Sequence, residues 1–334
     1  MKKLTLLMLL FGTTLALAQT SKPLYKQTAK WTIGGEGGWD YLTLSPNGDR
    51  LFVAHTNKIE VLDTSSGKVI GEIPANGAHG IALVPERNLG FSTNGRAGTV
   101  TVFHLDTLKP ETDIKAGENP DAVIYDPNSK RVIVMNGRSK DLMAIDPSTL
   151  KVVATVPLGG KLEFAAADVG HVYVNVEDLA EIAAVNTKNW KQDQRWKLNG
   201  CEEPSGLALD PKQNVLFAVC GNKVMAVVAT KDGKQLATLP TGAGTDGAKF
   251  DADLKRAFAS NGEGTLTVVQ ESGNGKYEVL GNVDTARGAR TMALDPKTHK
   301  IYLATAELGP PAEGERRPST KPGTFSVLVY SPVR

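Results

Sequence analysis

The amino-acid sequence predicts an all-β protein that folds as a seven-bladed β-propeller closed by an N-terminal outer strand. Three observations predict this fold. A turn motif recurs seven times, each copy holds four short strand-like segments, and the last copy lacks a strand that a segment near the N-terminus can supply. Repeats of about 40–45 residues with four strands each are typical of propeller blades. Since the seven copies fill residues 19–334, we expect a single domain there.

A turn rich in proline, aspartate, asparagine and glycine marks each copy. Clear examples are residues 45–48, 126–129, 210–213 and 295–298. The turn proline, or the residue aligned with it, stands at positions 46, 85, 127, 169, 211, 252 and 296, so successive copies are 39 to 44 residues apart. Residues of these types supply the backbone angles and local hydrogen bonds of tight turns. The motif therefore separates the first two strands of each unit.

The third copy shows the order of strands within a unit. Its apolar or β-branched segments are residues 122–125, 132–135, 142–145 and 152–156, and none has a helical period. One such sheet cannot bury both of its faces, so neighbouring units must stack around an axis. The last copy ends after residues 325–330, and we expect residues 25–33 to supply its outer strand.

The first residues are typical of an export signal. Lys2 and Lys3 precede an apolar stretch at 4–11, and a small-x-small pattern follows at 16–18. We predict a signal peptide at residues 1–18, cleavage near Ala18, and a periplasmic or secreted protein. No later segment approaches the roughly 18 apolar residues that a membrane span requires.

The charge balance argues against a nucleic-acid partner. The chain has 38 basic and 36 acidic residues, so loss of Lys2 and Lys3 leaves 36 of each. A neutral chain with only 6% aromatic residues offers little attraction for phosphates and few surfaces on which bases can stack. An oxidising compartment permits a disulfide between Cys201 and Cys220, and two buried free thiols are the alternative.

Residues 102–137 resemble the YVTN-type propeller repeat. There a strand ends in Asp106, residues 107–109 read Thr-Leu-Lys, residues 117–120 read Gly-Glu-Asn-Pro, and a later strand ends in Asn-Gly at 136–137. The chain from residue 19 onward resembles YncE-like exported proteins of this family. The resemblance implies a propeller fold but no single activity, because such propellers serve binding, electron-transfer and hydrolytic roles.

The sequence departs from that repeat at two places. Residues 164–170 lack the turn proline, and residues 309–323 form an insertion in the last copy. We expect the insertion to be a disordered surface loop, with a lid over the channel as the alternative.

A set of titratable residues is the candidate functional site. In a propeller, the loops that lead into the innermost strands surround one mouth of the central channel. Reading these loops gives one residue for each copy: Asp40, His79, Asp121, Glu163, Glu203, Asp246 and Arg290. The loops between second and third strands add Arg96 and Arg138, and Arg287 precedes Arg290 by three residues. These arginines can bind an anion on the rim of the channel.

Three interpretations of these residues stay open. They are hydrated channel residues without a ligand, a site for a small polar or cationic ligand, or a site where carboxylates, with or without His79, hold a divalent cation. We predict an exported binding or interaction protein that needs no cofactor, although a divalent cation is left open. Its predicted partner is a small polar molecule or a protein.

The alternative function is metal-dependent hydrolysis, by resemblance to propeller lactonases. Its ligands or base would be Asp40, Glu163, Glu203 and Asp246. The sequence contains no Gly-x-Ser-x-Gly, no His-x-x-x-His and no Cys-x-x-Cys-His, so it favours a protein that is not an enzyme without deciding the question.

Overall fold

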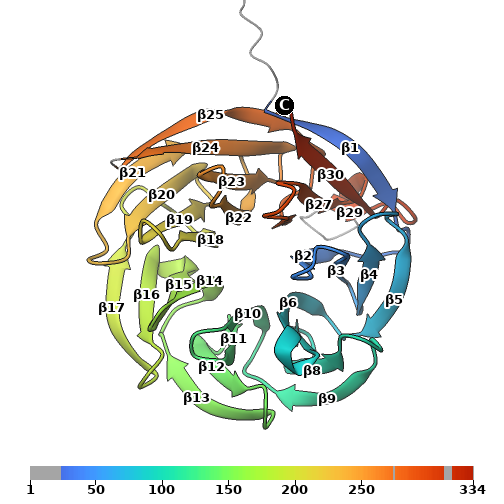
Figure 1. Cartoon of the computed structure of the whole chain (residues 1–334), viewed down its shortest axis with the longest axis horizontal. Coiled ribbons are helices and arrows are strands. Elements are labelled where there is room, and N and C mark those ends of the chain that lie inside the picture. Colours follow the sequence, from blue (N-terminus) through green and yellow to red (C-terminus); the bar gives the residue numbers. More distant parts are fainter. Residues whose placement is uncertain (1–23, 274, 312–317, 334) are drawn as a thin grey trace, which may run out of the picture.

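Seven four-stranded antiparallel sheets surround a central axis in sequence order (Figure 1). This computed structural model describes residues 24–273, 275–311 and 318–333. The chain is a seven-bladed β-propeller, so the predicted fold class is confirmed. The signal peptide predicted at residues 1–18 lies outside the described residues. Within the described ranges, no helix has the length and apolar character needed to cross a membrane.

The first six blades each consist of four consecutive strands that run outward from the axis. Blade 1 contains β2 (Trp39–Leu44), β3 (Arg50–His55), β4 (Lys58–Asp63) and β5 (Val69–Pro74), and blade 2 contains β6 (Ala78–Val84), β7 (Leu89–Asn94), β8 (Thr99–His104) and β9 (Pro110–Lys115). Blade 3 contains β10 (Pro120–Asp126), β11 (Arg131–Asn136), β12 (Asp141–Asp146) and β13 (Lys151–Pro157), and blade 4 contains β14 (Leu162–Asp168), β15 (His171–Val176), β16 (Glu181–Asn186) and β17 (Lys191–Lys197). Blade 5 contains β18 (Pro204–Asp210), β19 (Val215–Cys220), β20 (Val224–Ala229) and β21 (Gln235–Pro240), and blade 6 contains β22 (Thr245–Asp251), β23 (Arg256–Asn261), β24 (Thr265–Gly273) and β25 (Lys276–Asp284). Two single-turn 3₁₀ helices, η1 (Pro85–Arg87) and η2 (Glu177–Leu179), follow β6 and β15.

Blade 7 is built from both ends of the chain. Its strands, from the axis outward, are β26 (Met292–Leu294), β27 (Ile301–Thr305), β30 (Ser326–Pro332) and β1 (Tyr25–Thr32). The strand β1 runs antiparallel to β30, with Tyr25 opposite Pro332 and Thr32 opposite Ser326 (Figure 1). The predicted closure by an N-terminal outer strand is therefore confirmed.

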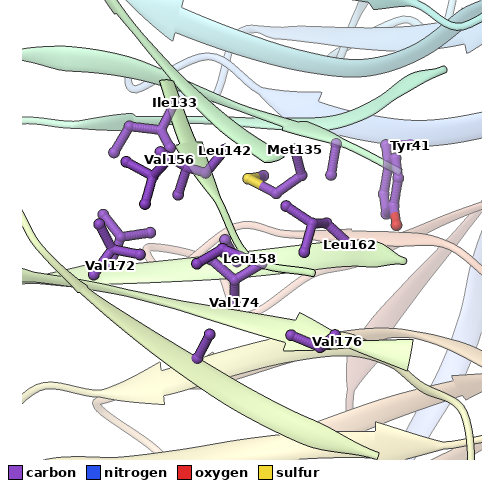
Figure 2. Close-up of a cluster of buried hydrophobic side chains, with 14 residues drawn as sticks. Tyr41, Ile133, Met135, Leu142, Val156, Leu158, Leu162, Val172, Val174 and Val176 are labelled. Atoms are coloured by element: carbon purple, nitrogen blue, oxygen red, sulfur yellow. The ribbon is translucent and has the colours of Figure 1, made fainter. Parts of the chain in front are cut away.

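The apolar core lies between neighbouring blades. In β11 the side chains alternate between the two faces of the sheet, as in any strand. Val132 and Val134 pack against blade 2, whereas Ile133 and Met135 pack in a cluster with Val174 of blade 4 (Figure 2). Both faces of the middle strands are therefore covered, which explains why these strands are apolar along their length.

A disulfide joins Cys201 to Cys220, with the Cα atoms 5.5 Å apart. Cys201 lies in the turn before β18 and Cys220 ends β19, so the bond ties the start of the inner strand to the neighbouring strand. Of the two alternatives that the sequence leaves open, the structure has the disulfide.

The insertion in the last blade begins and ends as a hairpin. The strands β28 (Leu308–Pro311) and β29 (Pro318–Thr320) pair with each other, and residues 312–317 between them lie outside the described residues. The Thr320 hydroxyl donates to the carbonyl of Gly37, 2.9 Å away. The base of the hairpin is thus attached to the loop that leads into blade 1.

Tyr25 tests the contribution of β1 to the closed ring. Its side chain is 1% exposed and meets Phe258 of blade 6 edge-on, with ring centroids 5.5 Å apart. We predict that Tyr25→Ala lowers the free energy of unfolding by about 3–5 kcal/mol, because it removes a buried aromatic ring. Tyr25→Phe should be close to neutral, because the buried hydroxyl has no hydrogen-bond partner among the residues that the structure describes.

Urea denaturation of the two variants and of the exposed control Lys26→Ala measures this difference. Equal midpoints for Tyr25→Ala and Lys26→Ala would mean that β1 does not unfold together with the ring.

Candidate functional site

A cavity of about 1020 Å³ opens at one end of the central axis. We call it the central cavity. Eight of the ten residues predicted for the site line it, namely Asp40, His79, Asp121, Glu163, Asp246, Arg290, Arg96 and Arg138. Further lining residues are Trp39, Tyr41, Asn119, Lys161, Glu177 and Ser205, and the hairpin contributes Leu308, Pro318 and Thr320. The inner strands and the loops after the second strands therefore meet at one mouth of the channel.

The strand register explains why these residues converge. In blades 1 to 6 the first residue of the inner strand pairs with the last residue of the second strand, as Trp39 does with His55 and Thr245 with Asn261. The register then shifts, and the next residue along the chain lies at the cavity. Blade 7 follows the same spacing. Met292 pairs with Leu303 as Leu42 pairs with Val53 in blade 1, so Arg290 corresponds to Asp40. The seven equivalent positions, here called the axial ring, hold Asp40, His79, Asp121, Glu163, Ser205, Asp246 and Arg290.

Glu203 does not occupy the ring position that the sequence predicts for it. The inner strand of blade 5 begins at Pro204, opposite Cys220, so Ser205 takes that position. Glu203 is exposed, lies in the preceding turn with a φ of 50°, and does not line the central cavity. The sequence was misleading because this turn carries two carboxylates just before the strand. The buried Ser205 hydroxyl donates to the carbonyl of Thr245, 3.1 Å away.

Arg287 also lies outside the central cavity. It lines a separate groove of about 350 Å³, which it shares with Lys30, Glu307 and Lys321. Gly288 has a φ of 88°, and its amide donates to the carbonyl of Gly262, 2.7 Å away. This turn separates Arg287 from Arg290. The two arginines are three residues apart in sequence but line two different cavities.

Most of the charged residues around the cavity have partners of opposite charge. The Nε atom of Arg290 donates to Asp246 at 2.8 Å, and the same guanidinium donates to the carbonyl of Trp39 at 3.3 Å. Lys161 lies 2.7 Å from Glu163 and also contacts Glu177, and these two carboxylates raise the pKa of its ammonium group against the effect of burial. Arg290 is therefore engaged by Asp246 and Trp39. The sequence had led us to expect an arginine available to an anionic ligand.

Asp40, His79 and Asp121 form a cluster in which one imidazole serves two carboxylates. The Nδ1 atom of His79 lies 2.5 Å from Asp40 Oδ2 and 3.1 Å from Asp121 Oδ1. Burial and the charge of Asp40 raise the pKa of Asp121 to about 7, and His79 opposes this only in part. Burial disfavours the charged form of His79, but its hydrogen bond to Asp40 outweighs this and raises its pKa. These three residues occupy the same ring position in three consecutive blades.

Glu163 and Asp246 experience the same crowding. Burial, followed by the charge of Asp121, raises the pKa of Glu163 to about 8. Burial also raises the pKa of Asp246, although Arg290 opposes the shift. Carboxylates therefore outnumber the cations that can offset them in the inner part of the cavity.

Arg96 and Arg138 provide positive charge at the mouth of the cavity. Both follow an Asn-Gly pair in the loop after the second strand, and both side chains are exposed. Neither has an ion-pair partner within the described ranges. Arg96 donates a long hydrogen bond, of 3.4 Å, to the amide oxygen of Asn57. The central cavity thus combines closely spaced carboxyl groups deep inside with two arginines at its rim.

Tyr41 closes the inner end of the cavity. It follows Asp40 in β2, and its ring reaches across the axis to Phe164 of blade 4, with centroids 5.0 Å apart. Figure 2 shows Tyr41 at the edge of the apolar cluster between blades 3 and 4. Tyr41 lines the cavity, whereas Phe164 does not, nor does Lys249, whose Nζ lies 5.0 Å from the Phe164 ring. The cavity therefore ends at Tyr41.

Sequence reasoning missed Tyr41, Lys161 and Ser205. Lys161 had a usable signal, because it precedes Glu163 by two residues and therefore lies beside the ring position. Tyr41 had none, because its place depends on the distance across the closed ring. Burial, then the charges of the surrounding carboxylates, raise the pKa of its hydroxyl well above the ordinary value.

Comparisons with known proteins identify the fold. No protein-family model matches the chain, and no curated protein does. Solved structures do match it. Hydrazine synthase of Kuenenia stuttgartiensis has a TM-score of 0.70 at 17% identity, over 81% of this chain and 93% of that chain. The U3-55K structure has a TM-score of 0.78 at 10% identity, over 93% of this chain and 100% of that chain. The RRP9 WD40 repeats have a TM-score of 0.79 at 10% identity, over 94% of this chain and 99% of that chain. The likeness is one of fold. At such low identities it transfers no ligand or activity.

Lys249 provides a test of the apolar surroundings below the cavity. Burial lowers the pKa of its amine to about 8, and no hydrogen bond or ion pair within the described ranges offsets the loss of solvation. The unfolded chain therefore binds more protons than the folded protein between pH 8 and about 10.5, so the penalty is fully present below pH 8 and disappears as the pH rises through this window. We predict that Lys249→Met raises the free energy of unfolding at pH 7 by about 1–3 kcal/mol, and by much less at pH 10.

Chemical denaturation of the wild type and Lys249→Met at both pH values measures the difference. Lys249→Arg is the matched control, because it retains a positive charge at both pH values and should gain nothing. A gain for Lys249→Met that is the same at pH 7 and pH 10 would contradict the assigned pKa.

Proposed function

We propose that this chain is an exported, YncE-like propeller of the YVTN-repeat type that binds a small polar ligand in the central cavity. The observation that carries this proposal is the separation of the Asp40–Asp121 pair from the rim arginines inside one cavity. Asp40 and Asp121 share a single imidazole at depth, whereas Arg96 and Arg138, at the mouth, have no ion-pair partner among the described residues. An unneutralised charge in a partly desolvated cavity favours a ligand group of the opposite sign.

The proposed ligand therefore brings positive charge to the Asp40–Asp121 side and negative charge to the rim arginines. A molecule that carries both charges at opposite ends, such as an amino acid or a short peptide, meets this requirement. The cavity volume of about 1020 Å³ is at the upper end of the range of small-molecule sites, about 300–1000 Å³. Trp39 and Leu308 in the lining supply apolar surface for the part between the charges.

The rim arginines provide the test of this proposal. We predict that a panel of zwitterionic amino acids and dipeptides contains ligands that raise the melting temperature of the protein. The double variant Arg96→Ala/Arg138→Ala should weaken their binding at least tenfold, since a charge-assisted hydrogen bond contributes about 1.5–3 kcal/mol. Isothermal titration calorimetry of the best ligand measures the loss.

Arg87→Ala is the matched control for surface charge. Arg87 is exposed in η1, at the end of the blade remote from the cavity, so its removal should leave affinity unchanged. The proposal fails if no member of the panel binds, or if the double variant binds as tightly as Arg87→Ala.

The second candidate function is metal-dependent hydrolysis of the lactonase type. One observation favours it, which is that Asp40 lies with His79 and Asp121 in a group suited to a metal ion. Of the other carboxylates first considered for this role, Glu203 lies outside the cavity, and Glu163 and Asp246 contact cations of the protein. Hydrolysis of an aryl ester or lactone that requires added metal and is lost in Asp40→Asn would support it.

A further inference from the structure

We propose that Asp40, His79 and Asp121 bind a divalent transition-metal ion, of the class of Zn²⁺ or Mn²⁺, at the inner end of the central cavity. The inference rests on the proposed function for the cavity and its rim arginines, and it makes a metal ion, in place of a cationic group of the ligand, the source of positive charge among the carboxylates. A ligand bound beside the metal then has to supply only an anionic oxygen.

The geometry of the three side chains suits one small ion. A nitrogen of His79 and one oxygen from each aspartate lie within 4.8 Å of one another. Ligand atoms about 2.0–2.2 Å from a metal are about 3.0–3.5 Å apart in octahedral or tetrahedral sites. The 3.1 Å separation between His79 and Asp121 already falls in this range, and the 2.5 Å separation between His79 and Asp40 needs to widen by about half an ångström.

The backbone holds these three side chains in a fixed arrangement. Each follows the first residue of an inner strand, in three consecutive blades, where the same register shift occurs. The Asp40 and Asp121 side chains are 14% and 15% exposed, so their positions are set by packing. Sites built on strands of a closed sheet architecture hold their geometry better than sites built on loops.

The charge distribution places the ion at this cluster and not elsewhere in the cavity. Arg290 offsets Asp246, and Lys161 offsets Glu163 and Glu177. Asp40 and Asp121 share only the proton on His79. A divalent ion that replaces this proton neutralises both carboxylates and uses the imidazole lone pair.

The hydroxyl of Tyr41 is a second and independent indication of a ligand. Tyr41 is 8% exposed and lines the central cavity, and within the described ranges its hydroxyl has no hydrogen-bond partner. The hydroxyl of this otherwise buried ring faces the cavity, where such groups normally meet a bound water or ligand. Tyr41 lines the same cavity as Asp40, His79 and Asp121, so its hydroxyl is available to a ligand oxygen bound there.

The donor set selects the class of metal. Imidazole nitrogen suits zinc and iron, and carboxylate oxygen suits manganese, whereas sites for calcium and magnesium are usually built from oxygen alone. Three protein ligands leave further positions open toward the cavity, as in catalytic and ligand-binding metal sites. A carboxylate or phosphate group of a ligand can then bridge the metal ion and the rim residues Arg96 and Arg138.

The experiment measures metal binding directly. Protein purified without a histidine tag and stripped with a chelator is titrated with ZnCl₂ and with MnCl₂ by calorimetry, and Co²⁺ serves as a spectroscopic probe. We expect one ion per chain and visible Co²⁺ absorption bands. Asp121→Asn and His79→Ala should each weaken binding at least a hundredfold, because each removes one of three ligands.

Matched controls separate this site from adventitious binding. His171→Ala removes a surface histidine that pairs with Asp193 at 2.9 Å and should leave the titration unchanged. Asp121→Asn is nearly isosteric, so it remains informative if His79→Ala does not fold. The absence of stoichiometric binding, or binding that is unaffected in Asp121→Asn, overturns the inference.

The same titrations distinguish this inference from the proposed function. If zwitterions bind to the stripped protein and metal does not, the metal site is wrong and the proposed function stands. If metal binds and the ligand panel fails with and without it, the metal site stands and the proposed ligand class is wrong.

Discussion

The pairing of β1 with β30 is the interaction on which the rest of this structure depends. Each sheet of a propeller covers its two neighbours. A ring that stayed open between blades 7 and 1 would leave one face of each of these two blades exposed to water. The antiparallel ladder from Tyr25 to Thr32 joins the two ends of the chain in one sheet and removes this cost. Closure also fixes how far each inner strand lies from the axis. The side chains that meet in the central cavity are therefore set by a contact at the outer edge of blade 7.

The sequence was sufficient for the architecture because the units repeat similar local signals at a nearly constant spacing. A turn proline, two apolar strands and an Asn-Gly loop give the period, and the missing outer strand of the last unit identifies the closing strand. The same periodicity located six members of the axial ring, since residues at equivalent positions of equivalent strands must face the same axis. No signal outside the sequence was needed for either step.

The remaining features depend on exact register and on distances across the ring. Glu203 was chosen in place of Ser205 because the start of β18 is set by its pairing with Cys220, which the spacing of charges does not reveal. Arg287 was misplaced because one glycine turn diverts it to another groove. The ion pair between Asp246 and Arg290 joins residues 44 positions apart. Only the folded structure therefore shows which carboxylates of the axial ring have a cationic partner.

The contact of Tyr41 with Phe164 has a consequence for traffic through the molecule. Two aromatic rings, from blades 1 and 4, approach each other at the inner end of the central cavity and narrow the axial channel there. The proposed ligand would therefore enter and leave by the mouth that carries the arginines and the base of the hairpin of β28 and β29. Under the proposed function, one ligand then has to leave before the next can bind, so dissociation limits the rate of exchange.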